Sequence, residues 1–194
     1  RPHRELRAHG VEIEDFDIWR RVGEDVGDRR QRRFQTRDGI ERIDAERQLR
    51  HFGMRNGVRV SILRAPGIYA SDRLPIERLQ KGVFALNAED DVFTNHIHAD
   101  DLARLACAAL RHGRANRCYN ATDDSAMTMG EYFDLVADRF ELPRAPRSPR
   151  SEAQKQMSPL QLSFMSESRR LDNRRIKTEL RAQLRFPQVA DGVN

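Results

Sequence analysis

No stretch of the 194-residue sequence approaches the run of about 18 apolar residues that a membrane-spanning helix needs. The opening residues, RPHRELRAHG, also lack the apolar segment of a secretory signal. We therefore expect a cytoplasmic protein that does not enter a membrane. Hydrophobic residues make up 38% and charged residues 34% of the chain, which allows one ordinary domain with a core but leaves parts of the chain with little to bury.

Cysteine is scarce, because the chain has only Cys107 and Cys118. Two cysteines are too few for a disulfide framework or a zinc site, so we expect reduced thiols in the core. His96 and His98 are two residues apart and would share one face of a strand. No third ligand accompanies them in the sequence, so we predict a pair that lines or caps the site and no metal.

Lysine is also nearly absent, since only three of the 35 basic residues are lysines. This excess of arginine is more typical of a GC-rich gene than of selection for phosphate contact. The net charge is +5, but 30 acidic residues are interspersed with the basic ones. The one dense basic run, DRRQRRFQTR at 28–37, contains a single aromatic residue, Phe34. We interpret it as a solvated charged segment and consider nucleic-acid binding unlikely.

Residues 1–40 have little periodic apolar pattern and form an atypical first segment, which we expect to be disordered in part. Its one regular piece, RELRAHGVEIEDFD, predicts the end of a helix followed by a strand that contains Val11 and Ile13.

From Ile40 the pattern becomes regular and predicts helix, strand, helix, strand, helix. The first two predicted helices cover 40–57 and 101–113. A third is expected to begin at Thr128, where Thr128 and Glu131 form a capping box. The predicted strands are VRVSIL, VFTNHIH and RCYNAT. Asp100 or Asp101 is expected to cap the second helix. This alternation favours an α/β fold with parallel strands.

The last third begins with a linker, PRAPRSPRSE. A helix that starts at Ser158 and a short helix in DNRRIKTEL are expected to follow it.

The segment LRAPGIY, residues 63–69, follows the VRVSIL strand, at the end of a strand where open parallel sheets bind ligands. Pro66 removes a donor from the strand, Gly67 lets the backbone approach a flat ligand, and Tyr69 supplies an aromatic wall. The same residues could also form an ordinary turn that ends a strand.

Several motifs occur in a fixed order: GVRVSILRAPGIY, NHIHADDLA, YNATDD, TMGEY, SRRLDNRR and LRFP. Over residues 41–193 this order resembles the extended or atypical short-chain dehydrogenase/reductases, and more narrowly the carboxyl-terminal part of the bacterial NAD-dependent epimerase/dehydratase family. The resemblance implies an incomplete Rossmann-like parallel sheet over residues 41–127 and a small substrate-binding lobe over 128–194.

The resemblance also implies a site. Ala65, Pro66 and Gly67 would form the loop under the nicotinamide of NAD or NADP. The residues that would face the substrate, a small or sugar-like hydroxyl compound or ketone, are Tyr69, Arg73, Asn95 and His98.

Two features of that family are missing. No G-x-G-x-x-G turn is present to hold a diphosphate, and Gly23 and Gly27 have the wrong spacing. The positions of the family's Lys and Tyr fall on Arg42 and Asp38, and Asp38 cannot replace a phenol. We therefore assign no catalytic residue and expect dinucleotide binding to be weak or absent.

Two origins of this departure stay open. The first half of the gene could be absent or frame-shifted. Alternatively, RELRAHGVEIEDFD could preserve a first helix and second strand, which would place Asp15 or Asp17 at a ribose hydroxyl.

The leading functional hypothesis is an epimerase/dehydratase-like oxidoreductase fragment that is weakly active or inactive by itself. The alternative is a non-catalytic interaction module on the same fold, which we expect to self-associate through exposed strand edges. A basic nucleic-acid-binding protein is the third.

Overall fold

The structure of the protein, a computed structural model, describes residues 37–156, 165 and 168–194. The helix and strand expected in RELRAHGVEIEDFD, nearly all of the dense arginine run, and the helix expected from Ser158 lie outside the described residues. No statement about them follows from the structure.

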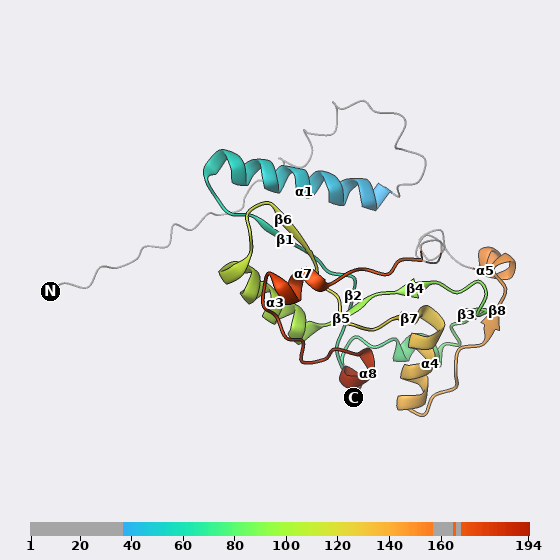
Figure 1. Ribbon diagram of the computed structural model, residues 1–194. Helices are drawn as coiled ribbons and strands as arrows, with labels where there is room; N and C mark the ends of the chain where they lie inside the picture. The colour runs from blue at the N-terminus through green and yellow to red at the C-terminus, as the bar shows by residue number, and fades with distance from the viewer. Residues whose placement is uncertain (1–36, 157–164, 166–167) are drawn as a thin grey trace.

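Helices and short strands alternate along the described chain (Figure 1). The helices are α1 (Arg37–Asn56), α2 (Ile76–Gln80), α3 (Ala99–His112), α4 (Met129–Arg139), α5 (Arg150–Gln156), α7 (Arg174–Thr178) and α8 (Val189–Gly192). The strands are β1 (Ser61–Arg64), β2 (Gly67–Tyr69), β3 (Ala85–Leu86), β4 (Phe93–Thr94), β5 (His96–His98), β6 (Arg117–Asn120), β7 (Met127–Thr128) and β8 (Arg147–Ser148).

The strands pair two by two, mostly in parallel. In the pair β1 and β6, Ser61 lies opposite Arg117 and Arg64 opposite Asn120. The pairs β2 with β5 and β3 with β8 are also parallel, whereas β4 and β7 are antiparallel. The prediction of an α/β fold with parallel strands is therefore confirmed. The extended stretch VFTNHIH contains two separate strands, β4 and β5.

Local sequence signals explain several helix ends. Helix α1 ends at Asn56, and Gly57 then takes a left-handed φ of 64° that a glycine adopts without strain. Helix α4 begins with the predicted capping box: Thr128 accepts from the amide of Glu131, and the Glu131 carboxylate accepts from the amide of Thr128. These two predictions are confirmed.

The predicted cap of α3 is wrong. His98 is the N-cap, and its Nδ1 accepts a hydrogen bond from the amide of Asp100 at 3.2 Å. Asp101 instead is buried, and its carboxylate accepts from the amides of Arg185 and Phe186 at 2.9 and 2.8 Å. The carboxylate thus ties α3 to the LRFP segment near the end of the chain.

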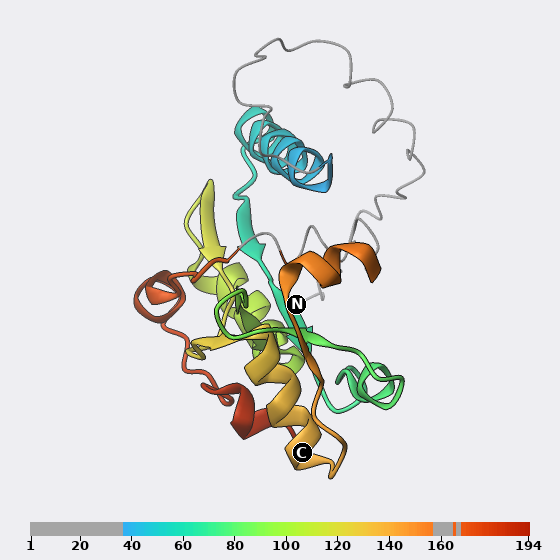
Figure 2. The ribbon, with the colours of Figure 1, turned by 90° about the vertical axis from the view of Figure 1, so that its right-hand side faces the viewer.

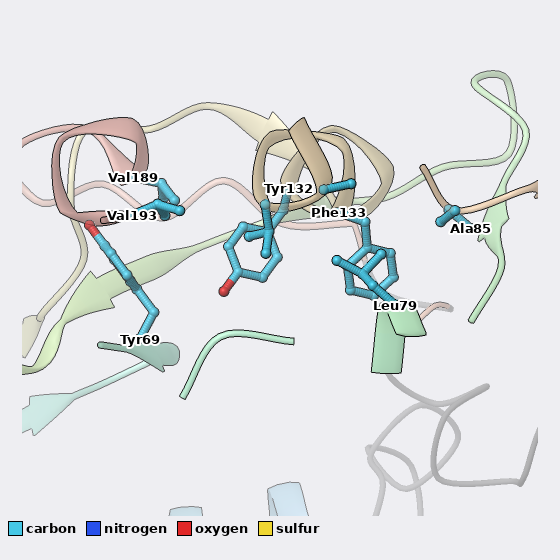
Figure 3. Close-up of a cluster of buried hydrophobic side chains, with 10 residues drawn as sticks. Tyr69, Leu79, Ala85, Tyr132, Phe133, Val189 and Val193 are labelled. Carbon is cyan, nitrogen blue, oxygen red and sulfur yellow. The ribbon is translucent and has the colours of Figure 1, made fainter. Parts of the chain in front are cut away.

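The two larger apolar clusters hold most of these elements together. The first joins the segment after β2 to α4 and α8, with Tyr69, Leu79, Phe133 and Val189 among its buried members (Figure 3). The second packs α3 and β6 against α7 and the residues after it; its buried members are Ile97, Leu105, Tyr119, Ala121, Ile176 and Leu180. Both clusters combine residues from before and after position 127, where the sequence predicted the boundary between the Rossmann-like part and the substrate-binding lobe. That division into two parts stays a prediction.

The expectation of two core thiols is wrong for one of them. Cys107 is exposed on α3, and Cys118 on β6 is half-buried. None of the described helices is long and apolar enough to span a membrane.

Candidate functional site

The LRAPGIY segment is a short break in a strand. Strand β1 ends at Arg64. Residues 65 and 66 belong to neither strand, and β2 begins at Gly67, where it pairs with β5. The amide of Gly67 donates to the carbonyl of Asn95 at 3.1 Å. A Cβ at Gly67 would lie 3.2 Å from Cδ2 of His96, so the glycine allows the backbone to approach this ring closely. The flat group next to Gly67 in the described chain is therefore a side chain of the protein itself.

Tyr69 is enclosed by protein. Only 1% of it is exposed, and its ring stands edge-on to the rings of His98 and His96, with centroids 5.2 and 6.3 Å away. Figure 3 shows its hydroxyl directed toward Val193 and Val189. That hydroxyl has no hydrogen-bond partner among the described residues. Burial raises the pKa of this phenol well above its usual value.

His96 and Asp123 bring two further buried titratable groups beside Tyr69. Burial lowers the pKa of His96 to about 4, and its ring packs against Tyr132 with a centroid distance of 4.3 Å. The backbone amide of Asp123 donates to the carbonyl of His96 at 2.8 Å. Burial raises the pKa of the Asp123 carboxyl to about 7, although one oxygen accepts from the amide of Ser125.

These residues form a site that we call the Tyr69 cluster: Tyr69, His96, His98, Asp123 and Tyr132. Within the described chain, Tyr69 Oη, His96 Nδ1 and Asp123 Oδ2 are buried and unpaired. A phenol, an imidazole and a carboxyl could each form a hydrogen bond with a hydroxyl or carbonyl group. Shifted pKa values of such groups are typical of functional sites. The sequence indicated Tyr69 and His98 directly, but Asp123 only as a member of the YNATDD motif and Tyr132 only as a member of the TMGEY motif.

Both polar atoms of the Asn95 side chain form hydrogen bonds. Its Nδ2 donates to the carbonyl of Arg169, and its Oδ1 accepts from the amide of Leu171, each at 2.8 Å. Asn120 and Asn173 make similar bonds between this segment and the strand ends, through the carbonyls of Asp172 and Thr122. The SRRLDNRR segment is thus held against the strands by asparagine side chains.

Arg73 differs from the other predicted substrate residues because its side chain is 58% exposed. It follows β2 in a turn in which its amide donates to the carbonyl of Ala70. It forms an ion pair with the neighbouring Asp72, which is long at 3.8 Å. The guanidinium is therefore accessible to a ligand, whereas Tyr69, Asn95 and His98 are engaged within the protein.

A groove of about 360 Å³ lies elsewhere, between α3 and residues 180–184. Its floor includes Leu105 and Leu180, and its rim carries Arg104, Arg111 and Arg181. It does not include a predicted site residue. Among residues 37–156, 165 and 168–194, no three His, Cys, Asp or Glu side chains are grouped to hold a metal ion.

The described residues do not form a site that fits the diphosphate of a dinucleotide. The 11 glycines of the sequence contain no G-x-G-x-x-G turn. Of the two described glycines with positive φ, Gly57 ends α1 and Gly82 follows α2. Neither lies in a strand-to-helix turn of the kind that binds a diphosphate. No catalytic step through a nicotinamide follows from the described residues.

Comparison with solved structures establishes what this fold is. A conserved protein of unknown function from Silicibacter pomeroyi DSS matches 82% of the chain with 27% identity and a TM-score of 0.73. A nucleoside-diphosphate-sugar epimerase from Pseudomonas aeruginosa also matches 82% of the chain, with 18% identity and a TM-score of 0.66. The fold is that of the epimerase/dehydratase structures.

A human epimerase family protein solved with NADPH shares this epimerase/dehydratase fold, with 18% identity over 70% of the chain and a TM-score of 0.58. The matches confirm the predicted resemblance and the incomplete Rossmann-like sheet at the level of the fold. The chain spans only about half of each solved structure, 55%, 53% and 47% in the order given. No protein-family model and no curated protein sequence matches the chain.

Proposed function

We propose that the chain is the substrate-side, carboxyl-terminal portion of an NAD(P)-dependent epimerase/dehydratase-like oxidoreductase. Its substrate class is a small or sugar-like hydroxyl compound or ketone. By itself the chain binds NAD or NADP weakly or not at all, and it is weakly active or inactive as an oxidoreductase.

One observation carries this proposal: the chain reproduces about half of the epimerase/dehydratase fold and has no glycine-rich turn in its sequence. A dinucleotide binds such folds through the amides of that turn, because they neutralise the diphosphate at a helix N-terminus. The matched part of the fold contains the LRAPGIY segment, which by the family resemblance would lie under the nicotinamide. It also contains the residues beyond that segment, which by the same resemblance would face the substrate.

Arg73 is the residue best placed to meet a substrate. It is exposed, and an arginine can bind the oxygens of a sugar or phosphate group through several donors. The side chains of the three other predicted substrate residues already contact protein groups. Ala65, Pro66 and Gly67 lie just before Tyr69 in the chain.

Ligand-observed NMR with UDP-glucose, a nucleoside-diphosphate sugar, tests the substrate side. We expect weak saturation transfer to the sugar protons with the unmodified chain and at least a fivefold loss with Arg73→Ala. Arg104→Ala is the matched control, because Arg104 has the same side-chain exposure of 58% but lies on α3 in the groove described above. No transfer with the unmodified chain, or equal loss in both variants, contradicts the assignment.

The second candidate is a non-catalytic interaction module on the same fold. The engaged side chains of Tyr69, Asn95 and His98 favour it, because they leave fewer groups for a substrate. Absence of UDP-glucose binding, together with a stable complex between two chains, would favour this candidate over the first. Salt-dependent retention on heparin without a shift of duplex DNA would argue against the third candidate, a nucleic-acid binder.

A further inference from the structure

The groove between α3 and residues 180–184, with a volume of about 360 Å³, has an apolar floor. Leu105 and Leu180 are buried there as members of the second apolar cluster, and Ala108 and Leu184 pack against that cluster. Figures 1 and 2 show α7 and the chain that follows it beside α3. Because its floor belongs to the packed core, the groove is formed before any ligand binds.

Three arginines surround this floor. Arg104 and Arg111 are seven residues apart on one face of α3, and Arg181 lines the groove from the facing segment. Each of these residues is exposed. Arg104 forms a long ion pair of 3.9 Å with Asp101, and among the residues that the structure describes neither Arg111 nor Arg181 pairs with a carboxylate. Their guanidinium groups are therefore available to an anion.

Among the described residues that line the groove, Asp101 is the only acidic one. Its oxygens accept hydrogen bonds from the amides of Arg185 and Phe186 at 2.9 and 2.8 Å, and only 1% of the residue is exposed. Three guanidinium groups thus surround one carboxylate, so the groove attracts negative charge. The buried carboxylate repels further negative charge, which favours an anion of single charge over a dianion such as a phosphate ester.

The backbone at Arg181 is in the left-handed region, with a φ of 54° that a glycine adopts without strain and an arginine adopts at a cost. The end of α7 imposes this conformation: the amide of Ala182 donates to the carbonyl of Ile176 at 3.0 Å, as in helix ends closed by a left-handed residue. A glycine would form this turn more easily. The arginine supplies a guanidinium that the turn does not use and that lies at the groove.

We propose that this groove is a binding site for a medium-chain fatty acid, with the alkyl chain on the apolar floor and the carboxylate held by the arginines. A guanidinium can bind a carboxylate through two parallel hydrogen bonds. If each non-hydrogen atom takes about 30 Å³, as a water molecule does, the groove holds about 12 such atoms, the number in decanoate.

The size of the groove favours a small molecule over a protein partner. Small-ligand sites have volumes of about 300 to 1,000 Å³, a range that includes this groove, whereas a protein partner needs a much larger surface. None of its lining residues belongs to the Tyr69 cluster, so the site is independent of the proposed function. We expect a dissociation constant for decanoate on the order of 100 µM.

Protection of Cys107 tests the proposal, because this exposed thiol lines the groove. The full chain is treated with N-ethylmaleimide, an uncharged reagent, and mass spectrometry follows Cys107 and Cys118 separately. We expect about 1 mM decanoate to slow alkylation of Cys107 at least fivefold and to leave that of Cys118, which is outside the lining, unchanged. Acetate, which has no alkyl chain, and decyltrimethylammonium, which has a cationic head, should each protect less than about twofold.

Three outcomes of this experiment would overturn the proposal. The first is unchanged alkylation of Cys107 in decanoate. The second is equal protection by decyltrimethylammonium, which would indicate adsorption through the alkyl chain alone. The third is protection by an acidic amphipathic peptide of leucine and glutamate in place of decanoate, which would assign the groove to a protein partner.

Replacement of Arg181 by glycine separates binding from folding, because glycine keeps the left-handed turn and removes the guanidinium. Isothermal titration with decanoate should give at least a fivefold higher dissociation constant, while the midpoint of urea unfolding does not fall. Arg111→Ala removes a guanidinium from the α3 side without touching the turn, and should weaken binding to a similar extent.

Two control variants lie outside the groove: Arg55→Ala removes an exposed arginine of α1, and Leu110→Ala removes an apolar side chain of α3 that is 81% exposed. Both should bind decanoate as the parent chain does. Unchanged affinity in Arg181→Gly and Arg111→Ala, or equal weakening in either control, would overturn the proposal.

Discussion

The ring of Tyr69 stands edge-on against the ring of His98, with centroids 5.2 Å apart and planes at 86°. Both rings contact Gly192 near the end of the chain. A Cβ at Gly192 would lie 2.9 Å from Cδ2 of His98 and 2.9 Å from Cε2 of Tyr69. Helix α8 therefore shields Tyr69 from solvent. Because Gly192 leaves no room for a larger side chain, a substitution at this residue tests the contact.

Replacement of Gly192 by alanine should destabilise the protein. The added methyl group would overlap two buried rings, and such overpacking typically costs about 1 to 3 kcal/mol. Urea unfolding followed by circular dichroism measures the change. Ala190→Ser, which adds one atom to an exposed position of the same helix, should change the free energy of unfolding by less than about 0.5 kcal/mol. Equal stability of Gly192→Ala and the parent chain would show that α8 does not pack on Tyr69 as described.

Replacement of Tyr69 by phenylalanine should leave stability unchanged or raise it by about 1 kcal/mol. The Tyr69 hydroxyl is buried with no partner in the described chain, so its removal relieves a desolvation cost while the ring stays in place. The same urea titration measures this. A loss of more than about 1 kcal/mol would mean that the hydroxyl is hydrogen-bonded in solution.

The Asp123 carboxyl should make stability depend on pH. Its pKa is about 7 in the folded chain, above the value of an unfolded aspartate, so the folded state holds the proton more tightly. Its contribution is fully present below about pH 4 and is lost as the pH rises through about 7. We expect the free energy of unfolding of the parent chain, relative to Asp123→Asn, to fall by about 1 to 3 kcal/mol between about pH 5 and 8.

The comparison with Asp123→Asn is needed because His96 acts in the opposite direction. Burial lowers its pKa to about 4, so its contribution is lost as the pH falls from its unperturbed value of 6.5 through that range. The two effects offset each other in the parent chain, but the difference between parent and variant isolates Asp123. If that difference does not change with pH, the carboxyl is not held in a buried environment.

Replacement of Asn95 by alanine should release the SRRLDNRR segment from the strand ends. The variant loses the bond to the carbonyl of Arg169 and the bond from the amide of Leu171. Loss of about 1.4 kcal/mol of local stability would speed hydrogen exchange of the Leu171 amide about tenfold. Asn87→Ala is the control, since the hydrogen bond of the Asn87 side chain to a described residue is a long one, 3.4 Å to Glu89. Unchanged exchange at Leu171 would show that the clamp does not hold the segment.

Features set by neighbouring residues could be predicted from the sequence. The end of α1 at Asn56, the Thr128 and Glu131 capping box, and the extended stretches that become β1 and β6 each depend on local signals. The roles of Asp101 and Asn95 could not be predicted in the same way. Asp101 binds amides 84 and 85 residues away, and Asn95 binds groups 74 and 76 residues away. The sequence gives no spacing rule for such contacts.

The candidate site also combines features set by neighbouring residues with contacts between residues far apart in the chain. The composition of LRAPGIY predicted that the backbone at Gly67 approaches a flat ligand, and in the described chain the group next to Gly67 is the ring of His96. Burial of Tyr69 depends on α8, which lies about 120 residues further along the chain and packs there through Val189 and Gly192. Asp123 gains its shifted pKa from this same enclosure, so no local pattern around it could reveal it.

Isothermal titration of the full chain with NAD+ and with NADP+ tests the central claim most directly. The human epimerase family protein solved with NADPH, titrated with NADPH, is the positive control. Because the sequence has no glycine-rich turn, we expect no saturable heat for this chain with either dinucleotide up to about 1 mM. A dissociation constant in the micromolar range would contradict the account, since it would require a diphosphate site that the described residues do not provide.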